Sequence, residues 1–196
     1  MRLGKKLLLI HCSVAVVFIA ISCWIEKLTV YSRFQQIETE TAKKNLQRCI
    51  EAIDREVYHI LAFTRDRAWW DDTVDFIKTN NPDYIKSNLG ASTVEDSGIH
   101  LFYFCDNQGQ ILWSHINDNE LEQDVQSLNL PKDKFPEGHI LMTDADKPVE
   151  QAVISGLYMT NYRPLLVAAV PIAPTNKEGR QSGTLIMGKF LCDEMI

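Results

Sequence analysis

The chain has 196 residues, of which 45% are hydrophobic and 23% are charged, and its formal net charge is −6. This length is enough for one domain with a hydrophobic core, and the acidic balance argues against binding to nucleic acid or to anionic lipid. The three cations before Glu26 are the only charges in that part, so the remainder of the chain carries −9.

The N-terminal segment predicts a membrane anchor. Leu7–Ile25 contains 19 residues without a charge, and as a helix they span roughly 28 Å, close to the thickness of a bilayer core. Three cations precede this segment and Trp24 lies at its far end, so we expect residues 1–6 in the cytoplasm and residues 26–196 outside. The protein is then a single-pass protein of the inner (plasma) membrane with a periplasmic domain. Cleavage as a signal peptide, and processing as a lipoprotein at Cys23, are the alternatives.

A long helix is predicted from Glu26 to Ile77, because this stretch contains neither glycine nor proline. Two apolar series with spacings of four and three residues follow it: Val30, Phe34 and Ile37, then Leu46, Ile50, Ile53, Val57, Ile60 and Thr64. Such a narrow stripe suits packing against a partner helix or against a sheet. The sequence therefore predicts a homodimer through the long helix.

Two adjacent indoles, Trp69 and Trp70, are followed directly by two adjacent carboxylates, Asp71 and Asp72. Indole favours burial and a carboxylate favours water or a partner, so this run predicts a corner where a buried surface meets a polar one. The corner is either a structural joint or the lip of a ligand pocket. Because neighbouring positions on a helix point about 100° apart, we expect Trp70 to pack inward and Trp69 to lie nearer the pocket mouth.

The acidic residues of this corner have two readings. Asp71, Asp72 and Asp75 match the spacing of a magnesium motif, and on a helix Asp71 and Asp75 share one face. An acidic helix start is favoured, because carboxylates stabilise the positive end of a helix dipole and no second acidic motif follows. Arg65 and Arg67 offer guanidinium donors to an anionic ligand, with a surface ion pair as the alternative.

The residues after the corner predict a short helix, a connection and the strands of a sheet. Asn81 and Pro82 predict an N-cap and first turn for a short helix to Leu89, which ends at a left-handed Gly90. A long irregular connection is expected from His115 to Pro148, with one short helix at Glu120–Leu128. Five strands are predicted, at Ile99–Phe104, Gln110–Ser114, Val153–Met159, Arg163–Ala173 and Gly183–Leu191. This order predicts an α+β fold, with a long N-terminal helix on a five-stranded antiparallel sheet.

The corner resembles a family signature. The matching residues are Asp66, Ala68, Trp70, Asp71, Asp72, Thr73 and Phe76, followed by Asn88 and Leu89. Later segments match in order: the turn at 106–109, the run 170–172 and the run 183–188. Over residues 45–196 the chain resembles the fourth class of CHASE domains, which are extracytoplasmic sensor modules of bacterial and archaeal signalling proteins. The resemblance implies a PAS-like or Cache-like fold between two membrane helices, with a cyclase or kinase output.

The candidate ligand-binding residues are Arg65, Trp69, Trp70, Asp71, Asp72, Tyr103 and Tyr162. We expect Tyr103, Tyr158 and Tyr162 to line a pocket that faces the long helix; ordinary core packing is the alternative. The five histidines have no metal-ligand spacing, and nucleophile elbows and phosphate loops are absent from the sequence. No catalytic residue, metal site or cofactor is therefore predicted.

These observations predict a membrane-anchored sensor domain that binds a small ligand or a periplasmic partner. The chain ends where a second membrane helix is expected, so we interpret it as a receptor truncated before its output domain. The alternative is a free-standing anchored binding or regulatory module, which could form mixed dimers with full receptors. Cys49, Cys105 and Cys192 allow at most one disulfide within the chain.

Overall fold

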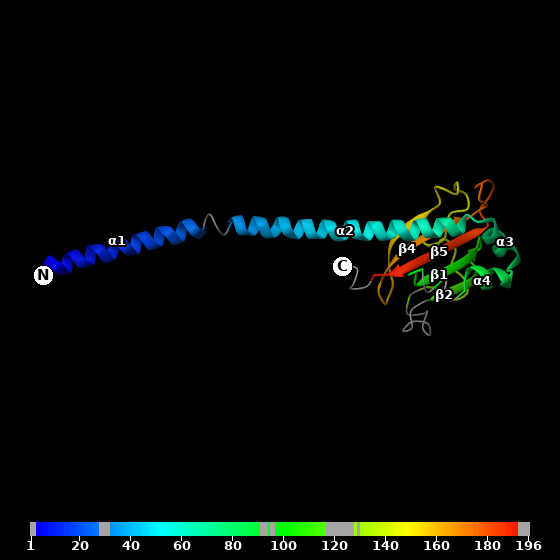
Figure 1. Cartoon of the computed structure of the whole chain (residues 1–196), viewed down its shortest axis with the longest axis horizontal. Helices are drawn as coiled ribbons and strands as arrows, with labels where there is room; N and C mark the ends of the chain where they lie inside the picture. Colours follow the sequence, from blue (N-terminus) through cyan, green and yellow to red (C-terminus); the bar gives the residue numbers. More distant parts are fainter. Residues whose placement is uncertain are drawn as a thin grey trace. The chain divides into compact units, whose positions relative to one another are not determined.

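The computed structural model describes residues 3–27, 32–90, 94, 97–116, 128 and 130–191. It divides the chain into two compact units, Met1–Ile50 and Glu51–Ile196. The first unit is helical, and the second contains the sheet and the helices that pack on it (Figure 1).

The first unit begins with α1, Leu3–Glu26, which has no buried residue. Among the described residues, α1 is the one helix long and apolar enough to cross a membrane, and it includes the whole predicted span Leu7–Ile25. The second helix, α2, runs from Ser32 to Ala68, and its first part lies in this unit. Apolar side chains of this first part are solvent-exposed, namely Phe34, Ile37, Leu46 and Ile50.

The prediction of one helix from Glu26 to Ile77 is wrong at its C-terminal end, because α2 stops at Ala68. Trp70 adopts an extended backbone (φ −101°, ψ 137°) and is the N-cap of a separate helix, α3, Asp71–Thr79. The break follows from burial. Ala68 is fully buried and its carbonyl oxygen accepts a hydrogen bond from the backbone N–H of Ala173, so a straight helix would leave the sheet surface.

Five antiparallel strands form one sheet in the order β2-β1-β5-β4-β3. Gly183 opens β5 so close to β1 that a Cβ atom there would overlap the carbonyl oxygen of Cys105. The strands are β1 Leu101–Asp106, β2 Ile111–Ile116, β3 Ile154–Met159, β4 Pro164–Ile172 and β5 Gly183–Phe190. The predicted α+β fold with a five-stranded antiparallel PAS/Cache-like sheet is confirmed.

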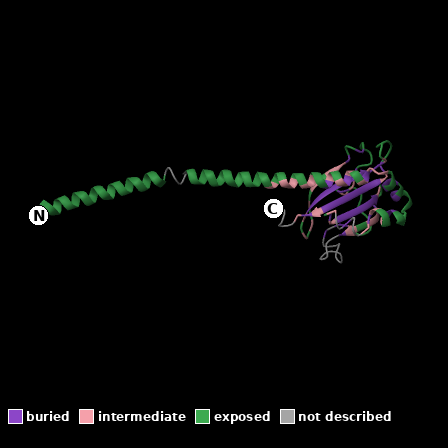
Figure 2. Ribbon diagram, viewed as in Figure 1, coloured by how far each residue is buried: buried purple, intermediate pink, exposed green. Residues whose placement is uncertain are grey.

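One face of the sheet is covered by the C-terminal half of α2, by α3 and by α4, Pro82–Asn88. The central strands are largely buried, and the C-terminal half of α2 carries buried, half-buried and exposed residues in turn (Figure 2). The predicted cap is confirmed, since the Asn81 side chain accepts a hydrogen bond from the Asp83 N–H. The left-handed Gly90 is wrong: Leu89 is the C-cap and Gly90 has no positive φ.

The opposite face is covered by the connection between β2 and β3. Leu128, Leu130, Phe135 and Leu141 of this connection pack against alternate residues of β1, β4 and β5. Residues 130–148 form turns and bends without a helix or strand, as predicted, whereas the next strand begins at Ile154 and not at Val153. The predicted helix Glu120–Leu128 lies almost entirely outside the described residues.

Candidate functional site

The corner residues form a joint between α2, α3 and the loop that joins β4 to β5. The Ala173 N–H donates to the Ala68 carbonyl over 3.2 Å, and the Thr175 N–H donates to Oδ1 of Asp71 over 3.0 Å. The first bond fixes the last turn of α2, and the second fixes the first turn of α3. Asp71 therefore already has a protein partner, and its position at the start of α3 fits an acidic helix start.

Thr73 closes the joint from the inside. Its hydroxyl donates to the carbonyl oxygen of Arg67 and lies 2.7 Å from the hydroxyl of Tyr84. Because a threonine hydroxyl has one proton, Tyr84 is the donor in the second bond. Burial raises the pKa of Tyr84, which keeps that proton in place. The Tyr84 ring stacks on Phe76 with centroids 4.8 Å apart, and Phe76 meets Phe104 of β1 edge-on at 5.6 Å.

The prediction that Trp70 packs inward is wrong. Trp69 packs against the helix-face core, whereas Trp70 is the extended N-cap residue of α3 and is absent from that core. The prediction assumed that both residues continue the helix, and the chain leaves helical geometry at this point. The Trp69 ring also lies near two cations: the Lys177 Nζ is 4.4 Å and the Arg65 guanidinium carbon 5.7 Å from its centroid.

Several polar atoms of the joint are buried without a hydrogen-bond partner: Arg65 Nε, Arg67 Nε and Trp69 Nε1. The charge next to them is balanced locally, because Lys177 Nζ lies 2.6 Å from Oε1 of Glu150. This bond holds the pKa of the exposed Glu150 carboxyl below its usual range. The Arg65 guanidinium lies over the Trp69 ring.

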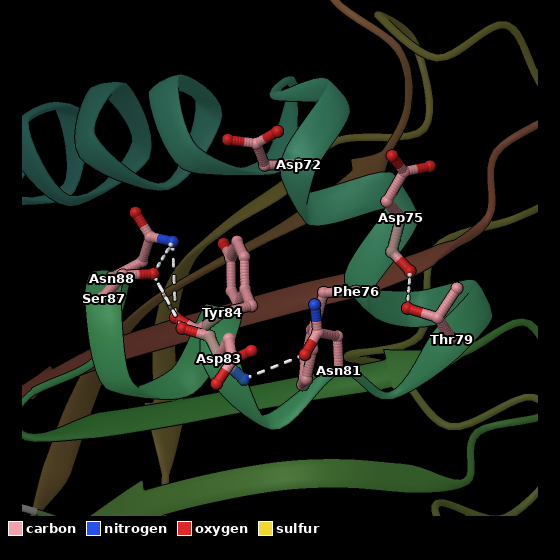
Figure 3. Close-up of a pocket in the computed structure, with 9 residues that line it drawn as sticks. All are labelled: Asp72, Asp75, Phe76, Thr79, Asn81, Asp83, Tyr84, Ser87 and Asn88. Carbon is pink, nitrogen blue, oxygen red and sulfur yellow. Dashed lines mark hydrogen bonds between the residues drawn. The ribbon is translucent and has the colours of Figure 1, made fainter.

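Asp72 faces a different space, an open cleft of about 270 Å³ between α3 and α4 (Figure 3). Asp75 of α3 and Asp83 of α4 line the same cleft, so three carboxylates surround it. In the described part of the chain, no group of three or more histidine, cysteine or acidic side chains is arranged to hold a metal ion. The cleft is an acidic surface feature beside the joint.

The tyrosines predicted to face the long helix lie on the other side of the sheet, so that prediction is wrong. Tyr103, Tyr158 and Tyr162 all belong to the core or its margin on the face opposite α2. Tyr103 is 1% exposed, and its hydroxyl has no hydrogen-bond partner. Burial raises the pKa of Tyr103, so the hydroxyl stays protonated. Tyr162 meets Phe190 edge-on at 5.8 Å.

A cavity of about 850 Å³ opens on this second face. The Phe135 ring contacts both Tyr103 and His139. Its centroid lies 5.4 Å from that of Tyr103, in an edge-on arrangement, and 4.9 Å from that of His139. Partial burial lowers the pKa of His139, which favours the neutral ring. The lining comes from the β1–β2 turn and from the β2–β3 connection: Asn107, Gln108, Gly109, Lys134, Phe135, Pro136, Glu137, Gly138, His139, Ile140, Met142, Thr143, Asp144 and Ala145.

The sequence analysis missed the residues of this cavity. They follow one another in an irregular segment that has no helical or strand period, so no pattern separates them from an ordinary loop. The one available signal was the placement of Phe135 and His139 between prolines and glycines. An aromatic residue in such a segment needs a surface to cover.

The seven predicted ligand residues therefore do not form one pocket. Five lie at the joint or the adjoining cleft: Arg65, Trp69, Trp70, Asp71 and Asp72. Tyr103 and Tyr162 lie on the opposite face of the sheet, the face on which the 850 Å³ cavity opens. Their part in ligand binding stays a prediction. Cys49 and Cys105 are free thiols, and burial raises the pKa of Cys105 to about 12.

Residues 52–196 match the CHASE4 domain. The chain is 27% identical over 130 residues to the methanogenesis regulatory histidine kinase FilI of Methanothrix harundinacea. This match covers 64% of this chain but only 14% of that protein. The E. coli DcuS sensor domain aligns with a TM-score of 0.48 at 14% identity, covering 71% of this chain and 92% of the sensor domain. The extracellular domain of vpHK1S-Z8, a proposed histidine kinase, aligns with a TM-score of 0.47 at 14% identity, covering 78% and 60%.

Proposed function

The chain belongs to the CHASE4 domain family of sensor domains, and we propose that it is the ligand-binding, extracytoplasmic part of a signalling receptor held in the plasma membrane by α1. The similarity to a regulatory histidine kinase supports a kinase as the output. The chain spans about 14% of that relative's length, so the output is part of the proposal.

We place the ligand in the 850 Å³ cavity on the face opposite α2. The observation that carries this choice is the combination of an open cavity with a buried, unpartnered hydroxyl on Tyr103 behind its aromatic wall. A pocket of this size accepts a small organic molecule, and mixed polar and apolar walls fix its orientation. An unpaired buried hydroxyl costs free energy unless a bound molecule or water satisfies it.

The joint supports a structural role better. Its hydroxyls and carboxylate are engaged with backbone groups: Thr73 with Arg67, and Asp71 with Thr175. The adjoining cleft is smaller and exposes three carboxylates without an opposing cation in its lining. We therefore assign the signature to holding α2 on the sheet.

Signal transfer requires that ligand binding change the balance between two arrangements of α2 on the sheet. A partly buried ion pair joins the two elements, with Lys189 Nζ of β5 3.0 Å from Oε2 of Glu56 of α2. Ile60 and Thr64 are buried at the same contact. This surface is where we expect α2 to move.

The exposed part of the α2 stripe supports a parallel homodimer. Leu46 and Ile50 keep the heptad spacing of the partly buried Ile53 and Val57 and of the buried Ile60 but remain exposed. Anchoring by α1 makes neighbouring copies emerge from the membrane in one direction, which favours a parallel pair. Ile50→Cys, in a background with Cys12, Cys23 and Cys49 replaced by serine, should form a crosslinked dimer on mild oxidation. Arg55→Cys, outside the stripe, should not do so in the same background.

A thermal-shift screen of the full chain in detergent tests ligand binding. The probes are a defined set of small carboxylates, amino acids and amines. We expect a saturable rise in melting temperature for at least one probe, and its loss in Lys134→Ala, which removes a lining cation, but not in Lys132→Ala, which lies outside the lining. A shift that survives Lys134→Ala, His139→Ala and Tyr103→Phe alike would contradict the assignment of the cavity.

A further inference from the structure

The loop between β4 and β5, residues 173–182, is bonded to both of the regions described above. On the cavity side it contributes Gln181, a buried polar residue that is 6% exposed. The Thr143 hydroxyl donates to Oε1 of Gln181 over 3.2 Å, and the Gln181 side-chain amide donates back to the Thr143 carbonyl over 3.3 Å. Thr143 lines the cavity, so the loop is fastened to its wall.

Two more contacts strengthen this attachment. The Thr143 and Thr184 hydroxyl oxygens are 2.7 Å apart, and Thr184, the second residue of β5, is fully buried. Asn107, which also lines the cavity, donates from its side-chain amide to the Gln181 carbonyl over 2.8 Å. A buried hydrogen bond that is broken and not replaced costs free energy. A shift of Thr143 or Asn107 therefore displaces Gln181 with it.

The other end of the same loop holds the joint. Ala173 donates its N–H to the last residue of α2, and Thr175 donates its N–H to Asp71 at the start of α3. Lys177 places its ammonium group 4.4 Å from the centre of the Trp69 ring. Three consecutive odd-numbered positions of the loop thus contact the break between the two helices.

The loop between these attachments is internally braced. The Lys177 N–H donates to the Pro174 carbonyl over 2.7 Å, and the Ser182 N–H donates to the Ile172 carbonyl over 2.7 Å. The Asn176 side chain accepts a hydrogen bond from the Glu178 N–H over 3.0 Å. These three bonds brace the loop between its two attachments.

We propose that the β4–β5 loop couples the ligand cavity to the end of α2, with Gln181 as the positioning residue between them. The inference rests on the proposed ligand cavity for its purpose, but the mechanical link is independent of any ligand. In this arrangement a ligand that draws Thr143 or Asn107 toward itself shifts Gln181, and the loop passes the change to the joint. By linkage, a change at the joint alters the cavity wall to the same extent.

Hydrogen–deuterium exchange on the full chain in detergent tests the link without a ligand. Thr143→Val removes the hydroxyl that meets Gln181 and Thr184. We expect exchange of the Ala173 and Thr175 amides to accelerate about fivefold, the factor that one ordinary hydrogen bond contributes to a local opening equilibrium. In the reverse direction, Asp71→Ala should accelerate exchange of the Thr143 amide, which donates to Oγ1 of Thr184.

Ile140→Ala is the matched control, because Ile140 lines the same cavity and is 68% exposed. It should leave the Ala173 and Thr175 amides unchanged. Equal acceleration by Ile140→Ala would show general loosening and overturn the proposal, as would unchanged exchange in Thr143→Val. If the β1 amides lose protection in Thr143→Val, the fold itself is damaged, and the milder Asn107→Ala decides by the same criterion. A failed ligand screen would leave this result standing, so the two proposals fail separately.

Discussion

The two faces of the sheet are built in different ways. On the helix face, Phe76 stacks on Tyr84, both rings meet Phe104 edge-on, and the Tyr84 hydroxyl is bonded to Thr73. On the opposite face, Tyr103 is buried even more deeply than Tyr84, yet its hydroxyl has no partner, and a cavity opens beside Phe135. The hydroxyls of the first face are bonded, although three nitrogens of the joint are not, and the second face has an open cavity. We call them the closed face and the open face.

The difference explains where the recognisable signature lies. Several residues that match the family serve the closed face, namely Ala68, Asp71, Thr73 and Phe76, whereas Asp72 lines the adjoining cleft. On the closed face, a helix break, a first turn and a buried hydroxyl each need a particular residue. A cavity needs only space and a few polar groups, which many residue combinations supply. A sequence signature in a sensor domain therefore indicates the joint more directly than the ligand.

The largest effect is expected from removing the ring at the centre of the closed face. Phe76 is 1% exposed, so Phe76→Ala should cost about 3–5 kcal/mol of unfolding free energy, which urea denaturation measures. Tyr58→Ala removes an exposed ring from α2 and should change stability by less than about 0.5 kcal/mol. Equal losses in the two variants would break the comparison, because Phe76 would not be part of a closed core.

A smaller effect is expected at the buried hydroxyl of the joint. Thr73→Val leaves the Arg67 carbonyl and the Tyr84 hydroxyl without their partner, which should cost about 1–3 kcal/mol. Thr79→Val, in the same helix, removes an exposed hydroxyl bonded only to the Asp75 carbonyl and should have little effect. If denaturation midpoints of the two variants coincide, Thr73 is not the fastening that we describe.

A matched pair of tyrosines compares the faces directly. Tyr84→Phe removes a bonded hydroxyl and should cost about 1 kcal/mol, whereas Tyr103→Phe removes an unpartnered one and should be neutral or slightly stabilising. Both changes conserve the ring, so packing contributes equally. Thermal denaturation of the two variants side by side gives the order. The reverse order would mean that the hydroxyl of Tyr103 is satisfied and that the second face is not open.

The smallest effect is a pH dependence on the open face. Burial lowers the pKa of His139 below its ordinary value of 6.5, so the folded state binds this proton less readily than the unfolded state does. The stabilisation is therefore complete above that ordinary value and is lost as the pH falls through the folded pKa. His139→Gln should reduce the decrease in melting temperature between about pH 7.5 and pH 5. An unchanged decrease would place His139 in water.

Much of the fold was predictable because its signals are local. Asn81 caps α4 through its own neighbour, and the strands follow from apolar runs between turn residues. The start of a helix at Asp71 and Asp72 was predicted as well, but the bond that fixes the end of α2 was not, because its donor, Ala173, lies more than a hundred residues later. The face of the sheet on which Tyr103 lies was also not predictable, because β1 is buried on both faces and its sequence shows no alternation.

The site was less predictable than the fold for the same reason. The bonds between Thr143 and Gln181 join residues 38 positions apart, and neither residue belongs to a periodic element. Trp69 and Asp71 were found as a conspicuous pair, but their partners, Lys177 and Thr175, come from a loop that has no signature of its own. Local patterns identify the elements, and the contacts between loops decide which side chains meet.

Ligand-induced thermal shifts in two charge variants test the central claim most directly, namely that the open face senses and the joint holds. The probe is whichever carboxylate, amino acid or amine raises the melting temperature of the full chain. Asp72→Asn alters the cleft beside the joint, and His139→Ala alters the cavity wall. We expect the shift to persist in Asp72→Asn and to disappear in His139→Ala. A shift that disappears in Asp72→Asn and persists in His139→Ala would contradict it.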